Sequence, residues 1–352
     1  MIKIQYFAAL LLLTVAVACQ YPVDNSTLPA SKQFIVIDAE MTESYGKVNV
    51  AYTLTDVTSQ GGYLFPKVPK TAIYVTDSRG VKTDFVNGTT NTAFKGLVGE
   101  TYKLFVDVDG KKYESKPETM LACPELDSVT PQYQREVYRS SADLYYDGFD
   151  VYAQFKDIAG KENYYQWDWI HYEHADYCDK KFSKSDGQEV LFTCNPFECW
   201  NIYYNTRTIV QSDKLRDGQP IAKKVVRVPY ATPPNKYYLR VEQRAITANV
   251  YAYLQSLETQ TQSTGTLFDI PAQTRFSPNI YNVNELSEQI LGVFSVFSFR
   301  RKVIYVDRTQ KIDGATAKVF PESTPFTSDL LASSPCVEGL YRTRIKPEGW
   351  KD

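Results

Sequence analysis

The chain has 352 residues, a formal net charge of -2 and an ordinary composition, with 43% hydrophobic and 23% charged residues. This length exceeds one average domain and suits two. The balanced charge and the lack of a basic stripe argue against a nucleic-acid partner, because phosphate binding needs clustered lysine and arginine. The 27 tyrosines and 18 phenylalanines favour strands, so we expect a β-rich protein.

Residues 1–18 have the pattern of a bacterial lipoprotein signal peptide that ends before Cys19. Lys3 provides the positive start, residues 7–17 form a short apolar stretch, and small or β-branched residues precede the cysteine. The stretch is too short to span a membrane comfortably. We therefore expect Cys19 to be lipidated, with ordinary secretory cleavage near Ala18 as the alternative.

Residues 19–32 are polar and contain proline, as expected of a tether between a lipid and a folded domain. Strand patterns then follow at regular intervals: FIVIDAEM, KVNVAYTLTD, AIYVTD and TYKLFVDVDGKKYES. Asp109-Gly110 lies between two alternating apolar runs and predicts a tight hairpin. Residues 33–121 therefore predict a β-sandwich of immunoglobulin-like type.

Residues 122–352 predict a larger β-rich domain, and the segment LACPELDSV at residues 121–129 marks the boundary. Its strand patterns occupy residues 148–157, 162–174, 224–230, 236–246, 264–269, 290–299 and 302–307. One helix is expected near residues 247–262. Thr247 is a suitable N-cap there, and apolar residues at helical spacing form one stripe.

Five cysteines remain once Cys19 is assigned to the lipid, and in an exported protein they are disulfide candidates. They are Cys123, Cys178, Cys194, Cys199 and Cys336. The odd number predicts two disulfides and one free thiol, with one bridge among residues 178–199 and another joining Cys336. Zinc binding is the alternative, but the chain has no C-x-x-C pair.

His171 and His174 are the only histidines and the weak candidates for metal binding. A strand is predicted there, and positions three apart on a strand point to opposite faces, so we expect no metal site. Trp167, Trp169 and Trp200 are candidates for stacking on a sugar or another flat ligand, although such rings more often belong to a core.

The sequence contains no motif of a serine hydrolase, a zinc protease or a nucleotide-binding loop. The chain has two histidines, so any Ser-His-Asp or Cys-His catalytic site would have to use one of them. This excludes most catalysis of that type. A surface hydrolase with a catalytic pair of carboxylates stays an alternative, because a chain with 41 acidic residues contains many possible pairs. We expect a protein without enzymatic activity and without a cofactor.

In their order, several segments resemble the Bacteroidota lipoproteins catalogued as domain of unknown function 4249. These segments include FIVIDAEM, AIYVTDSRG, GETYKLFVDVDGKKYES, GFDVYAQFKDIAGKENYYQW, YYLRVEQRAITANVYAYLQSLETQTQ, SPNIYNVN, ILGVFS and the closing CVEGLYRTRIKPEGW. The likeness covers nearly the whole chain after the signal peptide. None of these segments is a catalytic signature.

The resemblance implies an outer-membrane lipoprotein with a carboxypeptidase-regulatory or immunoglobulin-like front domain. Such proteins tend to accompany SusC-type TonB-dependent transporters, so the implied role is binding and delivery of a nutrient. Only Cys19 carries over, as the lipidation site. We expect exposure at the cell surface rather than on the periplasmic face, although Asp24 is the one acidic residue close after Cys19. A structural or assembly role in an envelope complex is the alternative.

Overall fold

The computed structural model of the chain describes residues 33–53, 71–140, 143–174, 180–182, 189–191, 199–232, 236–262, 276–319, 336 and 338–351. Of these residues, 55% lie in strands and 6% in a helix, which confirms the expected mainly β fold. Cys19, the tether and the strand expected at 264–269 lie outside the described residues. Within the described part, no helix combines the length and the apolar character that crossing a membrane requires.

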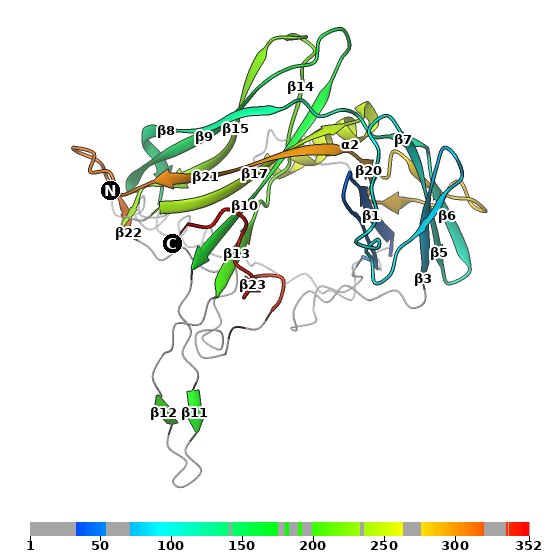
Figure 1. Ribbon diagram of the computed structural model, residues 1–352, viewed down its shortest axis with the longest axis horizontal. Coiled ribbons are helices and arrows are strands. Elements are labelled where there is room, and N and C mark those ends of the chain that lie inside the picture. Colours follow the sequence, from blue (N-terminus) through cyan, green and yellow to red (C-terminus); the bar gives the residue numbers. More distant parts are fainter. Residues whose placement is uncertain are drawn as a thin grey trace, which may run out of the picture.

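Two sheets form the first sandwich, on the right of Figure 1. The first sheet contains β1 (Ile35–Met41), β2 (Gly46–Tyr52), β19 (Ile290–Leu291) and β20 (Phe294–Val296). The second sheet contains β3 (Thr71–Asp77), β4 (Lys82–Asp84), β5 (Thr101–Val108), β6 (Lys111–Ser115), β7 (Glu118–Thr119) and β18 (Ile280–Asn282). Every second residue of β5 from Tyr102 to Val108 is buried, so the apolar alternation of the sequence matches the pleat.

Strands from late in the chain complete this first sandwich. β19 and β20 pair in parallel with β1, and β18 pairs with β6. Ile290 and Phe294 are buried in the same core as Ile37 and Leu104. The first sandwich therefore extends beyond residues 33–121, because its core needs apolar strands that the chain supplies only after residue 279.

Two further sheets form the second sandwich, on the left of Figure 1. One contains β8 (Leu126–Arg139), β9 (Tyr145–Lys156) and β15 (Pro220–Pro229). The other contains β10 (Tyr164–His174), β13 (Trp200–Tyr204), β14 (Ile209–Ser212), β17 (Lys236–Ile246), β21 (Ser298–Asp307) and β23 (Arg342–Thr343). Their facing sides bury Phe155, Trp167 and Leu239 in a second core. Two short pairs also occur: β11 (Lys180–Phe182) with β12 (Glu189–Leu191), and β16 (Ala231–Thr232) with β22 (Lys318–Val319).

The 14-residue strand β8 has no predicted counterpart in the sequence. Polar residues and Pro131 interrupt its apolar alternation, so the pattern there does not indicate a strand. β8 lies at the edge of its sheet, next to β9 only. An edge strand tolerates proline because one side of its backbone needs no ladder partner.

The helix α2 (Ala248–Gln262) confirms the helix expected near residues 247–262. Its Val250 is 1% exposed and belongs to a small core with Ile246 and Phe297. The Tyr251 backbone N–H donates to the Thr247 carbonyl at 2.9 Å, as the first turn requires. The Thr247 hydroxyl donates to Glu118 at 2.6 Å, so the start of α2 is joined to β7 of the first sandwich.

The apolar stretch at residues 290–299 is divided among β19, β20 and the start of β21. β19 and β20 pair with β1, whereas β21 pairs with β17 of the second sandwich. Phe297 lies between them, 1% exposed, and its backbone N–H donates to the Met41 carbonyl at 3.0 Å. This short segment therefore crosses from the first sandwich to the second.

Candidate functional site

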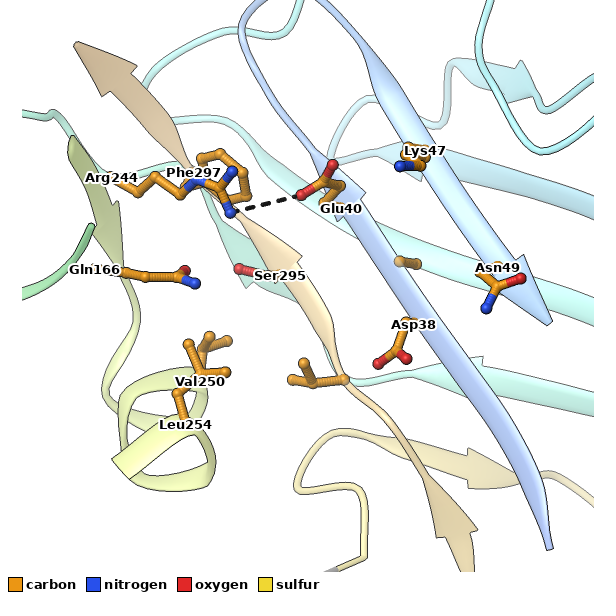
Figure 2. Close-up of a pocket in the computed structure, with 12 residues that line it drawn as sticks. Asp38, Glu40, Lys47, Asn49, Gln166, Arg244, Val250, Leu254, Ser295 and Phe297 are labelled. Atoms are coloured by element: carbon orange, nitrogen blue, oxygen red, sulfur yellow. Dashed lines mark ion pairs between the residues drawn. The ribbon is translucent and has the colours of Figure 1, made fainter. Parts of the chain in front are cut away.

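A cavity of about 290 Å³ lies where the first sandwich meets α2 and the second sandwich (Figure 2). Its walls come from β1, β2, β10, β17, α2 and the segment through β20. The lining residues are Asp38, Ala39, Glu40, Lys47, Asn49, Gln166, Arg244, Val250, Leu254, Val293, Ser295 and Phe297. This size is at the lower end for small-molecule sites, which are about 300–1,000 Å³.

Asp38 and Glu40 are two residues apart on β1 and therefore lie on the same face of the strand. The antiparallel register places Asn49 directly opposite Asp38 and Lys47 directly opposite Glu40. Side chains in such pairs are close neighbours, with Cβ atoms about 4.5–5.5 Å apart. Glu40 thus has a cation beside it on β2, whereas Asp38 has a neutral amide.

Arg244 provides the second cation near Glu40, with its guanidinium 3.8 Å from the Glu40 carboxylate (Figure 2). The same guanidinium lies 2.6 Å from Glu242 and 3.4 Å from Asp168. Burial by itself would lower the pKa of Arg244, but these three carboxylates raise it above its ordinary value. The positive charge of Arg244 is therefore already paired with carboxylates of the protein.

Asp38 differs from the other carboxylates of the cavity because it has no counterion within the described part of the chain. Water reaches the residue from the cavity side, yet the surrounding protein raises the pKa of its carboxyl by desolvation. A backbone hydrogen bond at Val293 opposes this rise in part. Asp38 is thus a solvent-exposed carboxylate at the cavity, with protein atoms on its other side.

Three neutral polar side chains of the cavity are uncommitted. Asn49 and Gln166 make no side-chain hydrogen bond to other described residues. The Ser295 hydroxyl is buried and has no hydrogen-bond partner in that part of the chain. In Figure 2 the Gln166 amide and the Ser295 hydroxyl point toward one another. A buried hydroxyl without a partner costs about 1–3 kcal/mol, so a bound molecule that supplied one would be favoured.

One wall of the cavity is apolar. It consists of Val250 and Leu254 of α2 together with Val293 and Phe297. The Arg244 guanidinium lies 4.6 Å from the centre of the Phe297 ring, which covers part of this wall. Apolar walls with a few converging polar groups are typical of sites that bind small molecules.

The three tryptophans that were candidates for ligand stacking lie away from this cavity. Trp167 is 0% exposed in the second core, and its indole N–H donates to Gln243 at 3.1 Å. Trp200 is 1% exposed and packs edge-on against Trp350, while Trp169 is half-buried against the second core. These rings do not form an exposed platform, because the sandwich uses them as core.

The two histidines lie on opposite faces of β10, as the sequence predicts. His171 is 3% exposed, stacks on Tyr237 at 3.6 Å and has its Nδ1 2.7 Å from the Tyr238 carbonyl oxygen. His174 is exposed at the end of the strand and contacts the Trp200 ring edge-on. The structure does not bring the two rings together.

Three of the five disulfide candidates lie among the described residues. Cys199 and Cys336 form a disulfide across 137 residues, so Cys336 is joined as expected. Cys123 is a buried free thiol, and burial raises its pKa to about 12, which keeps it protonated and unreactive at neutral pH. Cys178 and Cys194 lie outside the described residues.

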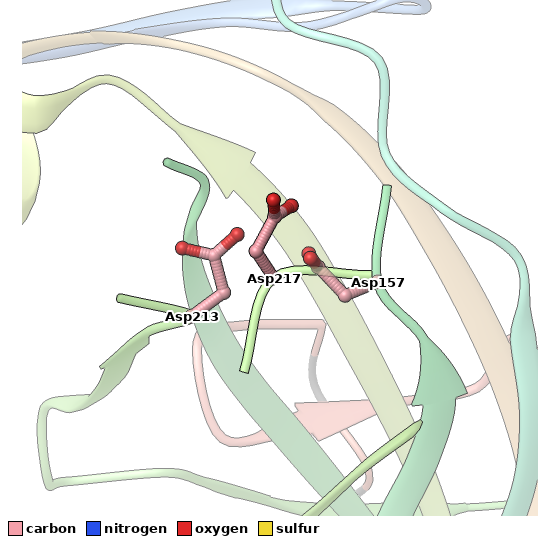
Figure 3. A group of neighbouring side chains, drawn as sticks. All are labelled: Asp157, Asp213 and Asp217. Carbon is pink, nitrogen blue, oxygen red and sulfur yellow. The ribbon is translucent and has the colours of Figure 1, made fainter. Parts of the chain in front are cut away.

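An acidic cluster in the turns that follow β9 and β14 was not identified from the sequence (Figure 3). Carboxylate oxygens of Asp157, Asp213 and Asp217 lie within 4.8 Å of one another. Burial raises the pKa of Asp213, and the neighbouring Asp157 raises it further. Oxygen ligands of this kind suit Ca²⁺ or Mg²⁺.

Each of these carboxylates already accepts a hydrogen bond from the turns around it. The backbone N–H groups of Gly218, Asn163 and Gly160 donate at 2.8, 2.9 and 2.8 Å to Asp157, Asp213 and Asp217, respectively. The Tyr165 hydroxyl also donates to Asp157. The cluster therefore joins the β9–β10 turn to the β14–β15 turn, and we assign it a structural part.

The cavity residues come from six separate segments, which is why the sequence alone did not identify them. The one local signal is in β1, where Asp38 and Glu40 interrupt an apolar strand on one face. The other polar residues, Asn49, Gln166 and Ser295, belong to strands whose pairing is not visible in the sequence.

Residues 20–303 match the family model described as domain of unknown function (DUF4249). No curated protein matches the chain at a significant level. The matched residues cover most of the chain and include every residue that lines the cavity. The chain therefore belongs to the DUF4249 family.

Proposed function

We propose that the protein is a non-enzymatic lipoprotein of a Bacteroidota outer membrane that binds a small ligand for a TonB-dependent uptake system. Cys19 carries the lipid, and the two sandwiches form the body outside the bilayer. The transporter partner is of the SusC type, and the protein serves as its accessory subunit.

The cavity between the sandwiches is the observation that carries this proposal. Asp38, which has no counterion among the described residues, and the uncommitted Asn49, Gln166 and Ser295 line the cavity together with an apolar wall. This arrangement favours binding of a small molecule. The signal-peptide pattern before Cys19 supports export and lipidation. The two basic residues of the cavity, Lys47 and Arg244, already have carboxylates of the protein beside them. This pairing fits a site that binds a ligand without converting it.

Affinity purification of the native protein from detergent-solubilised outer membrane tests the role in uptake. Mass spectrometry should find a TonB-dependent transporter in stoichiometric amount. Recovery of envelope assembly factors without a transporter would instead support the structural role. Turnover of glycan or peptide substrates that was abolished by changing one carboxylate would support the surface hydrolase.

The Cys19→Ala variant tests the anchor separately. Without a thiol to acylate, the protein should move from the membrane fraction to the soluble fraction. Metabolic labelling with a fatty acid should mark the wild-type protein and not the variant. A variant that stayed with the membrane would contradict lipid anchoring through Cys19.

A further inference from the structure

Among the described residues around the cavity, each charged side chain except Asp38 has an oppositely charged neighbour. Glu40 faces Lys47 across the strand pair and has Arg244 at 3.8 Å. Arg244 also contacts Glu242, and Glu242 in turn lies 2.6 Å from Arg301. Asp38 faces neutral Asn49, and within the described chain its carboxylate makes no ion pair. The cavity therefore has one carboxylate for which the described residues supply no countercharge.

We propose that this cavity binds a small organic cation, with an ammonium group of the ligand on Asp38 and its apolar part against Val250 and Leu254. This inference deepens the proposed ligand-binding role and rests on it. In Figure 2 the Asp38 carboxylate projects from β1 on the side of the strand that faces α2. A carboxylate without an ion-pair partner in the described part of the chain can form a charge-assisted hydrogen bond with an ammonium group of a ligand.

The neutral polar groups fit the remaining hydrogen-bonding needs of such a ligand. An ammonium donates up to three hydrogen bonds, and Asn49, directly opposite Asp38 in the strand register, has a side-chain carbonyl oxygen that could accept one beside the Asp38 carboxylate. Gln166 and Ser295 provide a second polar pair, which suits a hydroxyl or amide elsewhere on the ligand. The volume of about 290 Å³ limits the ligand to a compact molecule.

Isothermal titration calorimetry on the full chain in detergent tests this proposal with three probes of similar shape. They are 2-phenylethylammonium, the neutral 2-phenylethanol and the anionic phenylacetate. The ammonium should bind about tenfold more tightly than the alcohol, because only the ammonium forms an ion pair with the Asp38 carboxylate. Phenylacetate should bind most weakly, because Asp38 repels it.

Asp38→Asn keeps the shape of the side chain and removes its charge. It should weaken binding of 2-phenylethylammonium by about tenfold or more and leave 2-phenylethanol unchanged. The matched control is Asp84→Asn, which changes an exposed aspartate on β4 that pairs with Lys82 at 2.7 Å. This control should leave all three affinities unchanged.

Leu254→Trp locates the site independently of Asp38. Leu254 lies on the opposite wall, and the larger ring should fill the cavity and weaken binding of the ammonium and the alcohol alike. This second variant keeps the test decisive even if Asp38→Asn fails to fold.

Three results would overturn the proposal. They are equal affinity for the ammonium and the alcohol, an Asp38→Asn variant that binds the ammonium like the wild type, and no binding of the ammonium at millimolar concentration. If binding failed while the transporter still co-purified, the role in uptake would stand and the ligand class would be wrong. If binding succeeded without a transporter, only the uptake role would fall.

Discussion

Arg244 is a nearly buried charge that links the two sandwiches. Its side chain is 13% exposed, and its guanidinium contacts carboxylates from β1, β10 and β17. Glu242 is also nearly buried, and although burial would raise its pKa, Arg244 and Arg301 lower it. Removing the guanidinium would leave Glu242 with one partner in a poorly solvated place.

We expect Arg244→Met to lower the free energy of unfolding by about 3–5 kcal/mol, because it leaves buried carboxylates incompletely compensated. Urea denaturation of the full chain measures this change. The matched control is Arg139→Met, which removes an arginine that is 62% exposed and paired with the exposed Asp143. That variant should lose at most about 1 kcal/mol. Equal losses for the two variants would contradict a special role for Arg244.

Asp38 should make ligand binding depend on pH. Burial raises the pKa of its carboxyl, so affinity for 2-phenylethylammonium should fall on acidification, starting above the pH at which an exposed aspartate is protonated. The ammonium stays charged across this range. Of the charged groups nearby, Glu40 also has a pKa raised by burial, opposed by Arg244 and Lys47. Titration calorimetry between about pH 7 and pH 4 measures the dependence.

The Glu40→Gln variant distinguishes the two carboxylates in this experiment. If protonation of Asp38 causes the pH dependence, the affinity of Glu40→Gln for the ammonium should still fall on acidification. The affinity of Asp38→Asn should then not change with pH. An acid-independent affinity in the wild-type protein would show that Asp38 does not hold the ammonium.

The raised pKa of Asp38 affects the stability of the fold in the opposite direction to ligand affinity: acidification should favour the folded state. The folded protein holds the proton of Asp38 more tightly than the unfolded chain does, so the contribution of Asp38 to stability is lost as pH rises through the folded-state pKa. Asp38→Asn therefore should not lower the unfolding temperature at neutral pH. A stable variant that does not bind the ammonium would separate a binding function of Asp38 from a structural one.

The β19–β20 segment joins the two sandwiches and depends on one glycine. Gly292 has a φ of +94° and separates β19 from β20, both of which pair with β1. A Cβ at this position would clash with the Ile37 carbonyl oxygen and lie 2.8 Å from the Asp38 carboxylate. The glycine therefore allows β1 and its two parallel partners to approach.

Gly292→Ala should lower the free energy of unfolding by about 3 kcal/mol or more, since strain at positive φ adds to a backbone clash. Gly110→Ala is the matched control. Gly110 also has a positive φ, of 77°, but a Cβ there would meet no atom within 4 Å. The control should lose only about 1–2 kcal/mol. Equal losses in urea denaturation would show that the approach of the backbone at Ile37 has no energetic importance.

The hairpin at Asp109-Gly110 and the strand β8 show what local sequence can predict. The hairpin was predicted correctly, because both residues adopt positive φ and this dipeptide is the common one for such turns. β8 was not predicted, since its polar residues and Pro131 are acceptable only at a sheet edge. The position of a strand within its sheet is a property of the assembled fold.

The disulfide joins two segments of the second sandwich that lie far apart in the chain. Cys199 precedes β13, and Cys336 lies close before β23, its antiparallel partner. The bridge closes a loop of 137 residues in sequence, so it strongly restricts the unfolded chain. It should therefore contribute to the stability of the whole protein.

Cys336→Ser should lower the free energy of unfolding by about 2–4 kcal/mol in non-reducing buffer. Cys199→Ser and the double variant should show the same loss, because each removes one shared bond. Additive losses in the double variant would mean that the cysteines act separately and not through their disulfide.

Local patterns in the amino-acid sequence determined the β class, the helix at residues 247–262 and the opposite faces of His171 and His174. Each of these depends on neighbours within a few residues, where side-chain periodicity decides which face is apolar. The tertiary structure decided the rest: β19 and β20 beside β1, the burial of Trp167 and Trp200, and the cavity around Asp38. Periodicity predicts which face of a strand is buried but not which strand it pairs with. Strand pairing depends on the burial of apolar surface between segments far apart in the chain. The cavity between the two sandwiches therefore exists only once both have folded.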